Sequence, residues 1–200
     1  MVSAFRELDE LGCILWNDAK RAEAHLHDDT ARRQFVRAVF AYIEGLVYRL
    51  KRVIITGHEA GRYDLLPSDL ALLREETYEL DDKGNPQVRP AHLSTTRNMR
   101  FTFAQYEKAW GGSFTLEVDT QGWGTLRSAT AIRNRLMHPK SVADLEVSQD
   151  EANTVQVCFE WFTAEFCRLL ESCPPPKPGD QSSPDPLGGF FKRGAKFKAK

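Results

Sequence analysis

The chain has 200 residues, of which 42% are hydrophobic and 28% charged, as in an ordinary globular protein. This length predicts one well-packed domain. The longest uncharged apolar stretch, Val53–Gly57, is far shorter than the ~20 residues that a membrane span requires. The charged N-terminal segment does not follow the pattern of a signal peptide. We therefore expect a soluble, cytoplasmic protein without a membrane partner.

The net charge of −1 is unevenly distributed along the chain. Residues 173–200 contain six Lys/Arg against two Asp, so residues 1–172 carry a net charge of −5. An acidic body of this kind cannot hold nucleic acid through its overall charge, and any such binding has to be local. The four cysteines form no CxxC or zinc-type pair. They indicate buried free thiols in a reducing compartment, and we expect neither a metal nor a cofactor.

Helical periodicity dominates the first half of the chain. Residues 3–26 place apolar side chains on one helical stripe, and Asp28 or Asp29 is suited to cap the next helix. That second helix has the widest apolar face in the sequence and should end near Gly57. We expect its basic residues, Lys51 among them, outside this face. Residues 65–80 predict a short third helix with Ser68 as its N-cap, and residues 81–90 a loop or a small hairpin.

The second half continues the helical pattern. Ser94 or Thr95 can cap a helix that the Gly-Gly pair at 111–112 closes. The Gly-Trp-Gly sequence at 122–124 favours a turn, after which Thr125 or Ser128 opens a helix that Pro139 ends. Residues 148–151 form a capping box that starts a long last helix. Together these elements predict an all-α fold, an up-and-down bundle of about five helices over residues 1–172.

After residue 172 the composition changes. A linker rich in Pro, Gly and Ser leads into the basic tail FFKRGAKFKAK, and we expect residues 173–200 to be disordered. Phenylalanines alternate with positive charges in this tail. That pattern suits RNA, a membrane surface or a partner protein about equally, and it is also compatible with a plain disordered tail.

The run Arg133-Asn134-Arg135-Leu136-Met137-His138, just ahead of Pro139, is the strongest candidate site. Asn134 and His138 are four residues apart and share a helix face, and the long stem of Arg133 reaches the same side. A guanidinium can hold a phosphate and neutralise charge in the transition state, and an imidazole can transfer protons near neutral pH. The alternative is a histidine that interacts with the helix dipole beside surface arginines.

This run and its setting resemble the HEPN superfamily (higher eukaryotes and prokaryotes nucleotide-binding). The resemblance rests on RNRLMH at 133–138, the following HPKS, and a long last helix that contains Trp161-Phe162. The helix over 32–51, with Glu44 inside its apolar face, and the segment NMRFTFAQYEKAWG before the motif helix are also similar. The resemblance covers roughly residues 5–172 and omits the tail.

The resemblance implies a bundle of four or five helices and, for many members, a metal-independent endoribonuclease of toxin–antitoxin or phage-defence systems. It implies that Arg133 stabilises the phosphate in the transition state, that His138 is the general acid/base, and that Asn134 is the polar neighbour of the arginine. Motif residues from two subunits usually meet in one composite site, so we expect a homodimer that acts on RNA. Members silenced by a nucleotidyltransferase antitoxin often carry a tyrosine where this chain has Lys140.

The sequence is also compatible with other functions and other residue roles. The chain could be a non-catalytic HEPN-like module that binds nucleotide or RNA or serves as an interaction subunit, or an unrelated helical bundle. Asn134 could orient the imidazole or donate to a phosphate. Arg135 and Lys140 are candidates for substrate binding, although Arg135 could also be a plain surface cation. Glu44 either pairs with an arginine on another helix for structural reasons or approaches Arg133 or His138 and tunes them.

Two further clusters have simpler interpretations. His25 and His27 diverge on a helix and fall where a helix should stop, so they indicate a solvated cap more than a metal site. The four tryptophans are expected in the core. Trp123, flanked by glycines just before the motif helix, is the exception that could stack on a base.

Overall fold

Six α-helices and one short hairpin make up residues 2–174, the part of the chain that this computed structural model describes. The helices are α1 (Val2–Glu23), α2 (Asp29–Glu59), α3 (Pro67–Leu73), α4 (Thr95–Trp110), α5 (Gln121–Met137) and α6 (Gln149–Ser172), with the 3-10 turn η1 (Val142–Leu145) between α5 and α6. The strands are β1 (Glu76–Leu80) and β2 (Pro86–Pro90). The predicted all-α class is confirmed. Almost all of the predicted linker and basic tail, residues 175–200, lies outside the described residues.

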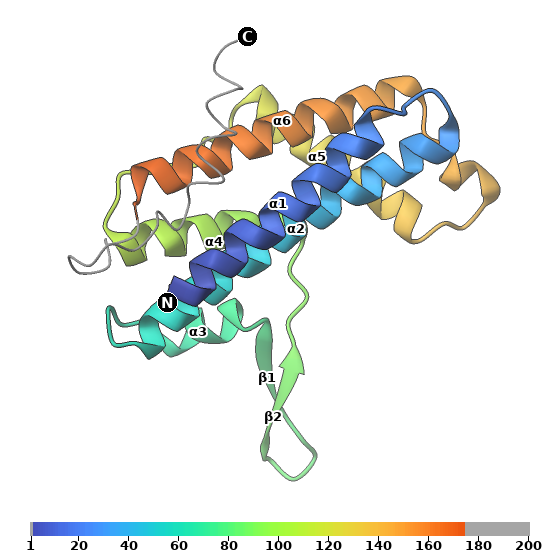
Figure 1. Cartoon of the computed structure of the whole chain (residues 1–200). Helices are drawn as coiled ribbons and strands as arrows, with labels where there is room; N and C mark the ends of the chain where they lie inside the picture. Colours follow the sequence, from blue (N-terminus) through green and yellow to red (C-terminus); the bar gives the residue numbers. More distant parts are fainter. Residues whose placement is uncertain (1, 175–200) are drawn as a thin grey trace.

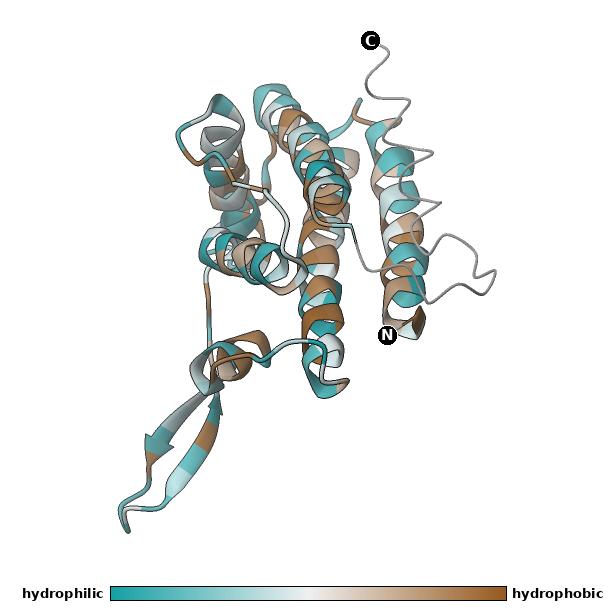
Figure 2. Ribbon diagram, turned by 90° about the vertical axis from the view of Figure 1, so that its left-hand side faces the viewer, coloured by the Kyte–Doolittle hydropathy of each residue, from teal (hydrophilic) through white to brown (hydrophobic). Residues whose placement is uncertain are grey.

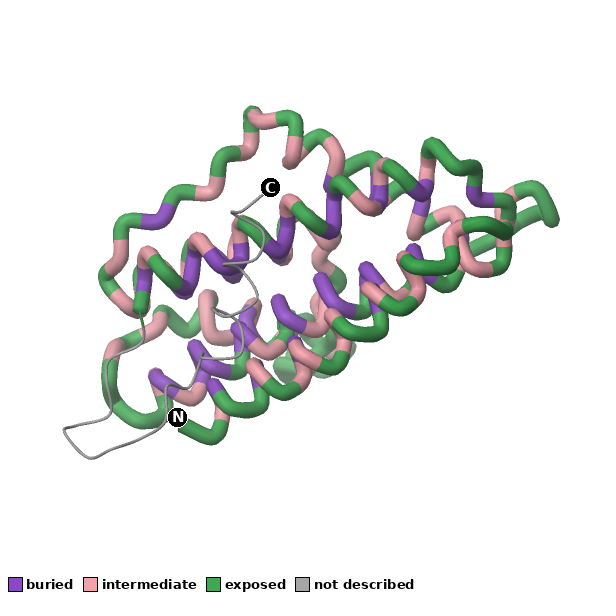
Figure 3. The backbone as a smooth tube through the Cα atoms, turned by 45° about the horizontal axis from the view of Figure 1, so that its top comes forward, coloured by how far each residue is buried: buried purple, intermediate pink, exposed green. Residues whose placement is uncertain are grey.

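Helix α2 is the centre of the bundle, and α1, α4, α5 and α6 all pack on it. Figure 1 shows α1 beside α2, with α6 across the top of the view and the hairpin pointing away from the helices. The wide apolar face predicted for α2 is buried, and a tube coloured by burial shows the buried segments turned toward the centre of the bundle (Figure 3). Aromatic rings fill the space between α2, α4 and α6, including Tyr42, Phe103 and Phe162.

The position of Lys51 differs from the one that the helical pattern predicted. We expected this residue on the polar side of α2, but its side chain is fully buried. A buried ammonium requires a partner, and Lys51 finds one in Glu75, whose Oε1 accepts a hydrogen bond from its Nζ at 3.0 Å. Glu75 comes from the segment between α3 and β1, so no periodicity within α2 could indicate this pair.

The hairpin follows a third helix that is shorter than expected. Helix α3 ends at Leu73, with Leu66 as N-cap and Pro67 in the first turn, and residues 76–80 form a strand instead of helix. Helix α3 stops because Glu75 takes a left-handed conformation, with φ of 59°. The two strands pair antiparallel, with Tyr78 opposite Val88, and project from the helices as a ribbon (Figure 2). Of the two options left open for residues 81–90, the hairpin is the one observed.

The motif helix α5 starts earlier than the sequence indicated. Its N-cap is Thr120, whose side chain accepts from the backbone N–H of Trp123, so the Gly-Trp-Gly sequence forms the first turn of α5 and no separate loop. Gly122 lies against α6, where an added Cβ would collide with the indole of Trp161. Trp123 packs edge-on against the same ring, at 6.2 Å between ring centroids. This explains the glycine and places Trp123 in the helix packing.

The remaining helix ends follow the sequence closely. Asp28 caps α2 by accepting from Ala31 N–H at 2.8 Å, Gly111 closes α4 in the left-handed conformation, and the capping box at 148–151 starts α6. In the described part of the chain, no helix combines the length and apolar character that crossing a membrane requires.

Candidate functional site

Arg133 lies on α5 with its side chain turned to α2. Its Nη2 is 2.9 Å from the Glu44 carboxylate, and its Nη1 donates to Asn134 Oδ1 at 3.1 Å. The side chains of Arg133 and Glu44 remain 24% and 40% exposed, so solvent screens this pair. The two options for Glu44 coincide: its partner is an arginine on a neighbouring helix, and that arginine is Arg133 of the motif. Glu44 therefore both neutralises Arg133 and fixes the direction of its guanidinium.

Asn134 lies beside Arg133 on the exposed side of α5. Its side-chain oxygen accepts from Arg133, which leaves its amide N–H groups directed to solvent. The amide is thus positioned next to the guanidinium and adds two donors to the same surface. It makes no hydrogen bond to the imidazole of His138 within the described chain.

His138 is the C-cap residue of α5 and is exposed. Its backbone N–H donates to Asn134 O at 3.1 Å, which completes the last turn before Pro139 breaks the helix. Its imidazole has no hydrogen-bond partner among residues 2–174. The ring is therefore available to solvent, to a substrate or to a second molecule, as a proton-transfer group has to be.

Arg135, two residues after Arg133, has a different environment. Its Nη1 donates to the carbonyl oxygens of Ala143, Asp144 and Glu146, at 3.4, 3.3 and 2.8 Å, and its Nη2 pairs with Glu151 at 2.6 Å. Arg135 thus joins α5, η1 and the start of α6. Because most of its donors are occupied within the chain, this geometry favours a structural role over the substrate-binding role considered from the sequence.

The loop after the motif is also fixed in place. Asp144 accepts from the backbone N–H groups of Lys140 and Ser141, at 2.8 and 2.9 Å, and these hydrogen bonds, led by the one from Lys140, lower the pKa of its carboxyl group. The Lys140 backbone is thereby held, while its side chain is exposed and makes no polar contact with the described residues. The ammonium of Lys140 remains available beside His138.

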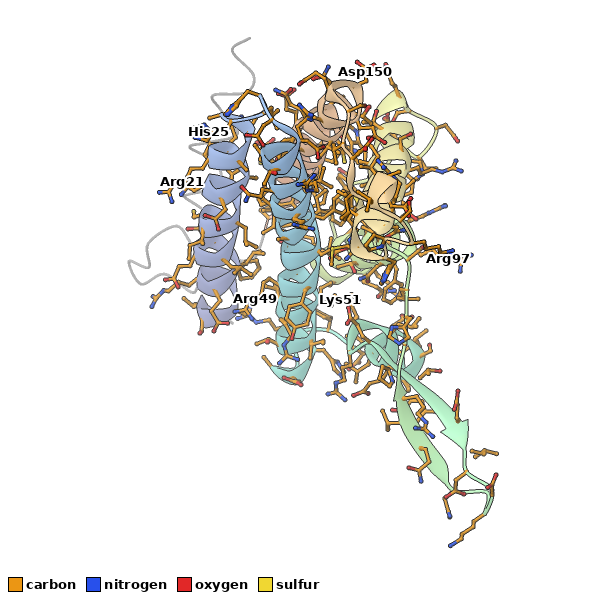
Figure 4. The ribbon with its side chains drawn as sticks, turned by 90° about the vertical axis from the view of Figure 1, so that its right-hand side faces the viewer. Arg21, His25, Arg49, Lys51, Arg97 and Asp150 are labelled. Atoms are coloured by element: carbon orange, nitrogen blue, oxygen red, sulfur yellow. The ribbon has the colours of Figure 1, made fainter. Side chains whose placement is uncertain are left out.

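A cavity of about 290 Å³ opens next to the Arg133–Glu44 pair, at the root of the hairpin. It is lined by Glu44, Val47, Tyr48, Glu75, Leu93, Thr95 and Asn98. Thr95 donates to Glu44 Oε1 at 3.4 Å, so the carboxylate that holds Arg133 is also part of the cavity wall. Figure 4 shows Lys51 on the side of α2 that faces α3 and the hairpin root, where it meets Glu75.

A larger polar cleft, of about 670 Å³, lies at the other end of the bundle. Four of its five charged residues are already paired with neighbouring groups: Arg32 donates to Val147 O at 2.5 Å, Asp29 accepts from Val147 N–H at 2.8 Å, and Arg135 binds Glu151. These contacts join the start of α2 to the loop before α6. We therefore infer a structural role for the residues of this cleft.

No grouping of histidine, cysteine, aspartate and glutamate within residues 2–174 could hold a metal ion. His25 and His27 lie in the turn between α1 and α2, and His27 Nε2 is 3.3 Å from Asp28. This agrees with the solvated cap expected from the sequence. The cysteines are free thiols, and burial raises the pKa of Cys158 to about 12, which keeps that thiol protonated and unreactive near neutral pH.

Comparisons of the chain with protein-family models, with curated proteins and with solved structures find no match. The site therefore has to be interpreted from its own geometry. Sequence patterns singled out Arg133, Asn134, His138 and Glu44 but not the cavity beside them. Tyr48, Glu75 and Asn98 come from three separate segments, and only the left-handed turn after α3 brings Glu75 to α2, so no local spacing could have indicated them.

Proposed function

We propose that this protein is a metal-independent endoribonuclease of HEPN type, and that it acts as a cytoplasmic homodimer. The observation that carries the proposal is the arrangement at the end of α5. A guanidinium fixed by Glu44, an amide beside it and an unpartnered, exposed imidazole lie within one helical turn and a half. The proposal also rests on the resemblance of RNRLMH in its helical setting to that superfamily.

The chemistry needs no metal or cofactor. The 2′-hydroxyl of RNA attacks the adjacent phosphorus, the bond from phosphorus to the 5′-oxygen breaks, and the products are a 2′,3′-cyclic phosphate and a 5′-hydroxyl. His138 of one subunit removes the proton from the 2′-hydroxyl, and an imidazolium returns a proton to the leaving oxygen. Arg133 and the amide of Asn134 donate to the phosphate oxygens as negative charge grows on them.

A dimer supplies what one chain lacks. One chain presents one motif imidazole, whereas in-line transesterification uses a base on one side of the phosphorus and an acid on the other. A two-fold axis beside the end of α5 would place two His138 rings and two Arg133 guanidinium groups in the same cleft. Lys140, exposed next to His138, would extend the positive surface along the RNA.

His138→Ala is the decisive variant. Because His138 is exposed and uses only its backbone in the helix cap, the substitution should preserve both the fold and the dimer. RNA cleavage by the purified protein should fall by at least about 100-fold, a typical loss for a general acid/base. His92→Ala, which changes another exposed histidine, is the matched control. Full activity of His138→Ala on every RNA tested would rule out the mechanism.

One observation favours the alternative, a non-catalytic RNA- or nucleotide-binding module. Arg133 is already paired with Glu44, and this pairing weakens its hold on a phosphate. Expression of wild type and His138→Ala in bacteria separates the two. Growth arrest with RNA fragmentation by wild type alone supports the enzyme, and it would also indicate that an antitoxin or another regulatory protein restrains it in its native cell. RNA binding by both proteins without cleavage supports the module.

A further inference from the structure

The cavity at the hairpin root contains polar groups that the fold itself leaves unused. Asn98 makes no side-chain hydrogen bond to any described residue, although its Oδ1 is shielded from solvent. Glu75 uses Oε1 to bind Lys51, and its Oε2 has no partner within residues 2–174. The hydroxyl of Tyr48, on a side chain that is 49% exposed, is likewise unpaired in the described chain. Of the three groups only Asn98 Oδ1 is buried, since the side chain of Glu75 is 44% exposed. Buried polar atoms are normally satisfied, so the unpaired Asn98 Oδ1 points to a ligand, with the free groups of Glu75 and Tyr48 beside it.

Glu75 gives a second, independent indication. It is the only residue other than glycine with positive φ among those described, and it directly follows the C-cap of α3, a position where glycine is strongly preferred. Its backbone is held by the hydrogen bond from Ala91 N–H to Glu75 O, at 2.7 Å. Strained backbone of this kind is typically retained where the side chain has a task. Here the strain places a carboxylate over a buried lysine and in the cavity wall.

The lining and the volume of the cavity suit a flat, aromatic ligand. Val47, Leu93 and the ring of Tyr48 provide apolar surface, whereas Glu75, Asn98 and Thr95 provide polar groups. A volume of about 290 Å³ is at the small end of ligand sites, enough for one base but not for two stacked nucleotides. Because Glu44 forms part of the wall and also binds Arg133, a phosphate on the guanidinium would have its base next to this opening.

The unused groups select among the four bases. A carboxylate only accepts hydrogen bonds, so it favours an edge with adjacent donors. Guanine presents two such donors, N1–H and the N2 amino group, and the cavity offers two free acceptors for them, the second oxygen of Glu75 and Asn98 Oδ1. Adenine and cytosine each present a ring acceptor next to one amino group, and uracil presents one N–H between two carbonyl groups. An acceptor facing the carboxylate would leave a desolvated group unpaired, which is strongly unfavourable.

We propose that this cavity binds the guanine base of an RNA next to the phosphate held by Arg133, with Tyr48 as the stacking surface, the free oxygen of Glu75 as acceptor from N1–H, and Asn98 Oδ1 as acceptor from the N2 amino group. This inference rests on the proposed function for the position of the phosphate. It adds a base preference to a site that would otherwise recognise only the RNA backbone.

Binding of the four 3′-mononucleotides to the full-length wild-type protein, measured by titration calorimetry, tests the inference without any need for cleavage. The 3′-GMP should bind at least about tenfold more tightly than 3′-AMP, 3′-CMP and 3′-UMP, as hydrogen-bond discrimination predicts. Equal affinities for all four nucleotides would overturn it.

Two pairs of variants locate the binding. Glu75→Gln retains an oxygen for Lys51 but replaces the free acceptor by a donor, so the preference for 3′-GMP should fall to within about twofold. Glu76→Gln makes the same charge change one residue away, outside the cavity wall, and should change nothing. Tyr48→Ala should weaken 3′-GMP about tenfold through lost stacking, whereas Tyr78→Ala on the hairpin should not. Unchanged 3′-GMP affinity in both Glu75→Gln and Tyr48→Ala would overturn the inference.

Cleavage assays keep this inference separate from the proposed function. Guanine-selective binding by a protein that cuts no RNA would support the cavity and overturn the nuclease. Cleavage with equal rates at all four bases would support the nuclease and overturn the guanine site. Tyr48 is half-exposed, so Tyr48→Ala should fold even if the ion pair of Lys51 makes Glu75→Gln unstable, and thermal unfolding of each variant confirms the fold.

Discussion

Two arginines of the same helix, Arg133 and Arg135, differ in how many hydrogen bonds their guanidinium groups make within the fold. Arg135 donates to three carbonyl groups and one carboxylate, and so joins α5 to the loop and to α6. Arg133 has one carboxylate and the amide of Asn134 as partners, on a surface that remains partly open to solvent. A sequence shows two equivalent cations, but the structure distinguishes one that holds the loop from one that can still bind an anion.

The difference follows from helix geometry. Residues two apart on a helix point about 200° apart, so Arg133 turns to α2 while Arg135 turns to η1 and α6. Each arginine thereby meets a different set of neighbours, and each substitution should affect a different property of the protein. Arg133 should matter for activity, and Arg135 for stability.

The substitution Arg133→Ala should have the largest effect, which is on the rate of RNA cleavage. Removal of the guanidinium should lower the rate of RNA cleavage by about 100- to 1,000-fold, as for other groups that stabilise charge in a transition state. Arg133→Lys should restore only part of the rate, because a lysine keeps the charge but loses the paired donors. Arg127→Ala, an exposed arginine on the same helix, is the control and should be fully active. An equal loss in Arg127→Ala would show that general charge, and not the site, governs cleavage.

For stability, the order of the two arginines should be reversed, with the larger loss on removal of Arg135. Arg135→Ala should lower the free energy of unfolding by about 2 kcal/mol, because three carbonyl groups and the Glu151 carboxylate lose their donor. Arg133→Ala should cost at most about 1 kcal/mol, since its ion pair is screened by solvent. Urea denaturation of the two variants measures both values. The comparison between the two arginines fails if Arg133→Ala is the less stable variant.

The smallest effect concerns the carboxylate that holds Arg133. Glu44→Gln should free the guanidinium and tighten inorganic phosphate binding by up to about fivefold, the equivalent of the ~1 kcal/mol that a partly exposed ion pair contributes. Calorimetric titration with phosphate at low ionic strength measures this change. If Glu44→Gln binds phosphate more weakly than wild type, Glu44 acts mainly by orienting Arg133 and not by competing with the anion.

Much of the fold was predictable from local patterns, because caps and apolar periodicity act over a few residues. The ends of α2, α4 and α6 follow from Asp28, Gly111 and Ser148 in this way. Two features were not predictable. Helix α3 was expected to continue to residue 80, but the left-handed Glu75 stops it, and that conformation is maintained by contacts with Lys51 and Ala91. Helix α5 starts at Gln121, where Gly122 allows close packing on Trp161.

The candidate site shows the same division between local and long-range information. Residues 133–138 are adjacent in the sequence, so their proximity at the end of a helix could be expected. The pairing of Arg133 with Glu44 joins residues 89 positions apart, and the sequence left it as one of two options. The cavity was not anticipated at all, because it requires α2, the hairpin root and the start of α4 to be in place together.

The hairpin also has a practical use. Figure 1 shows it projecting from the helices, with its turn at the end away from α5. The turn residues Lys83 and Gly84 are exposed. Asp81 fixes this turn by accepting from the backbone N–H groups of Lys83 and Asn85. A fluorophore or an affinity handle attached at Lys83 would therefore report on RNA capture or immobilise the protein while the surface around α5 stays free.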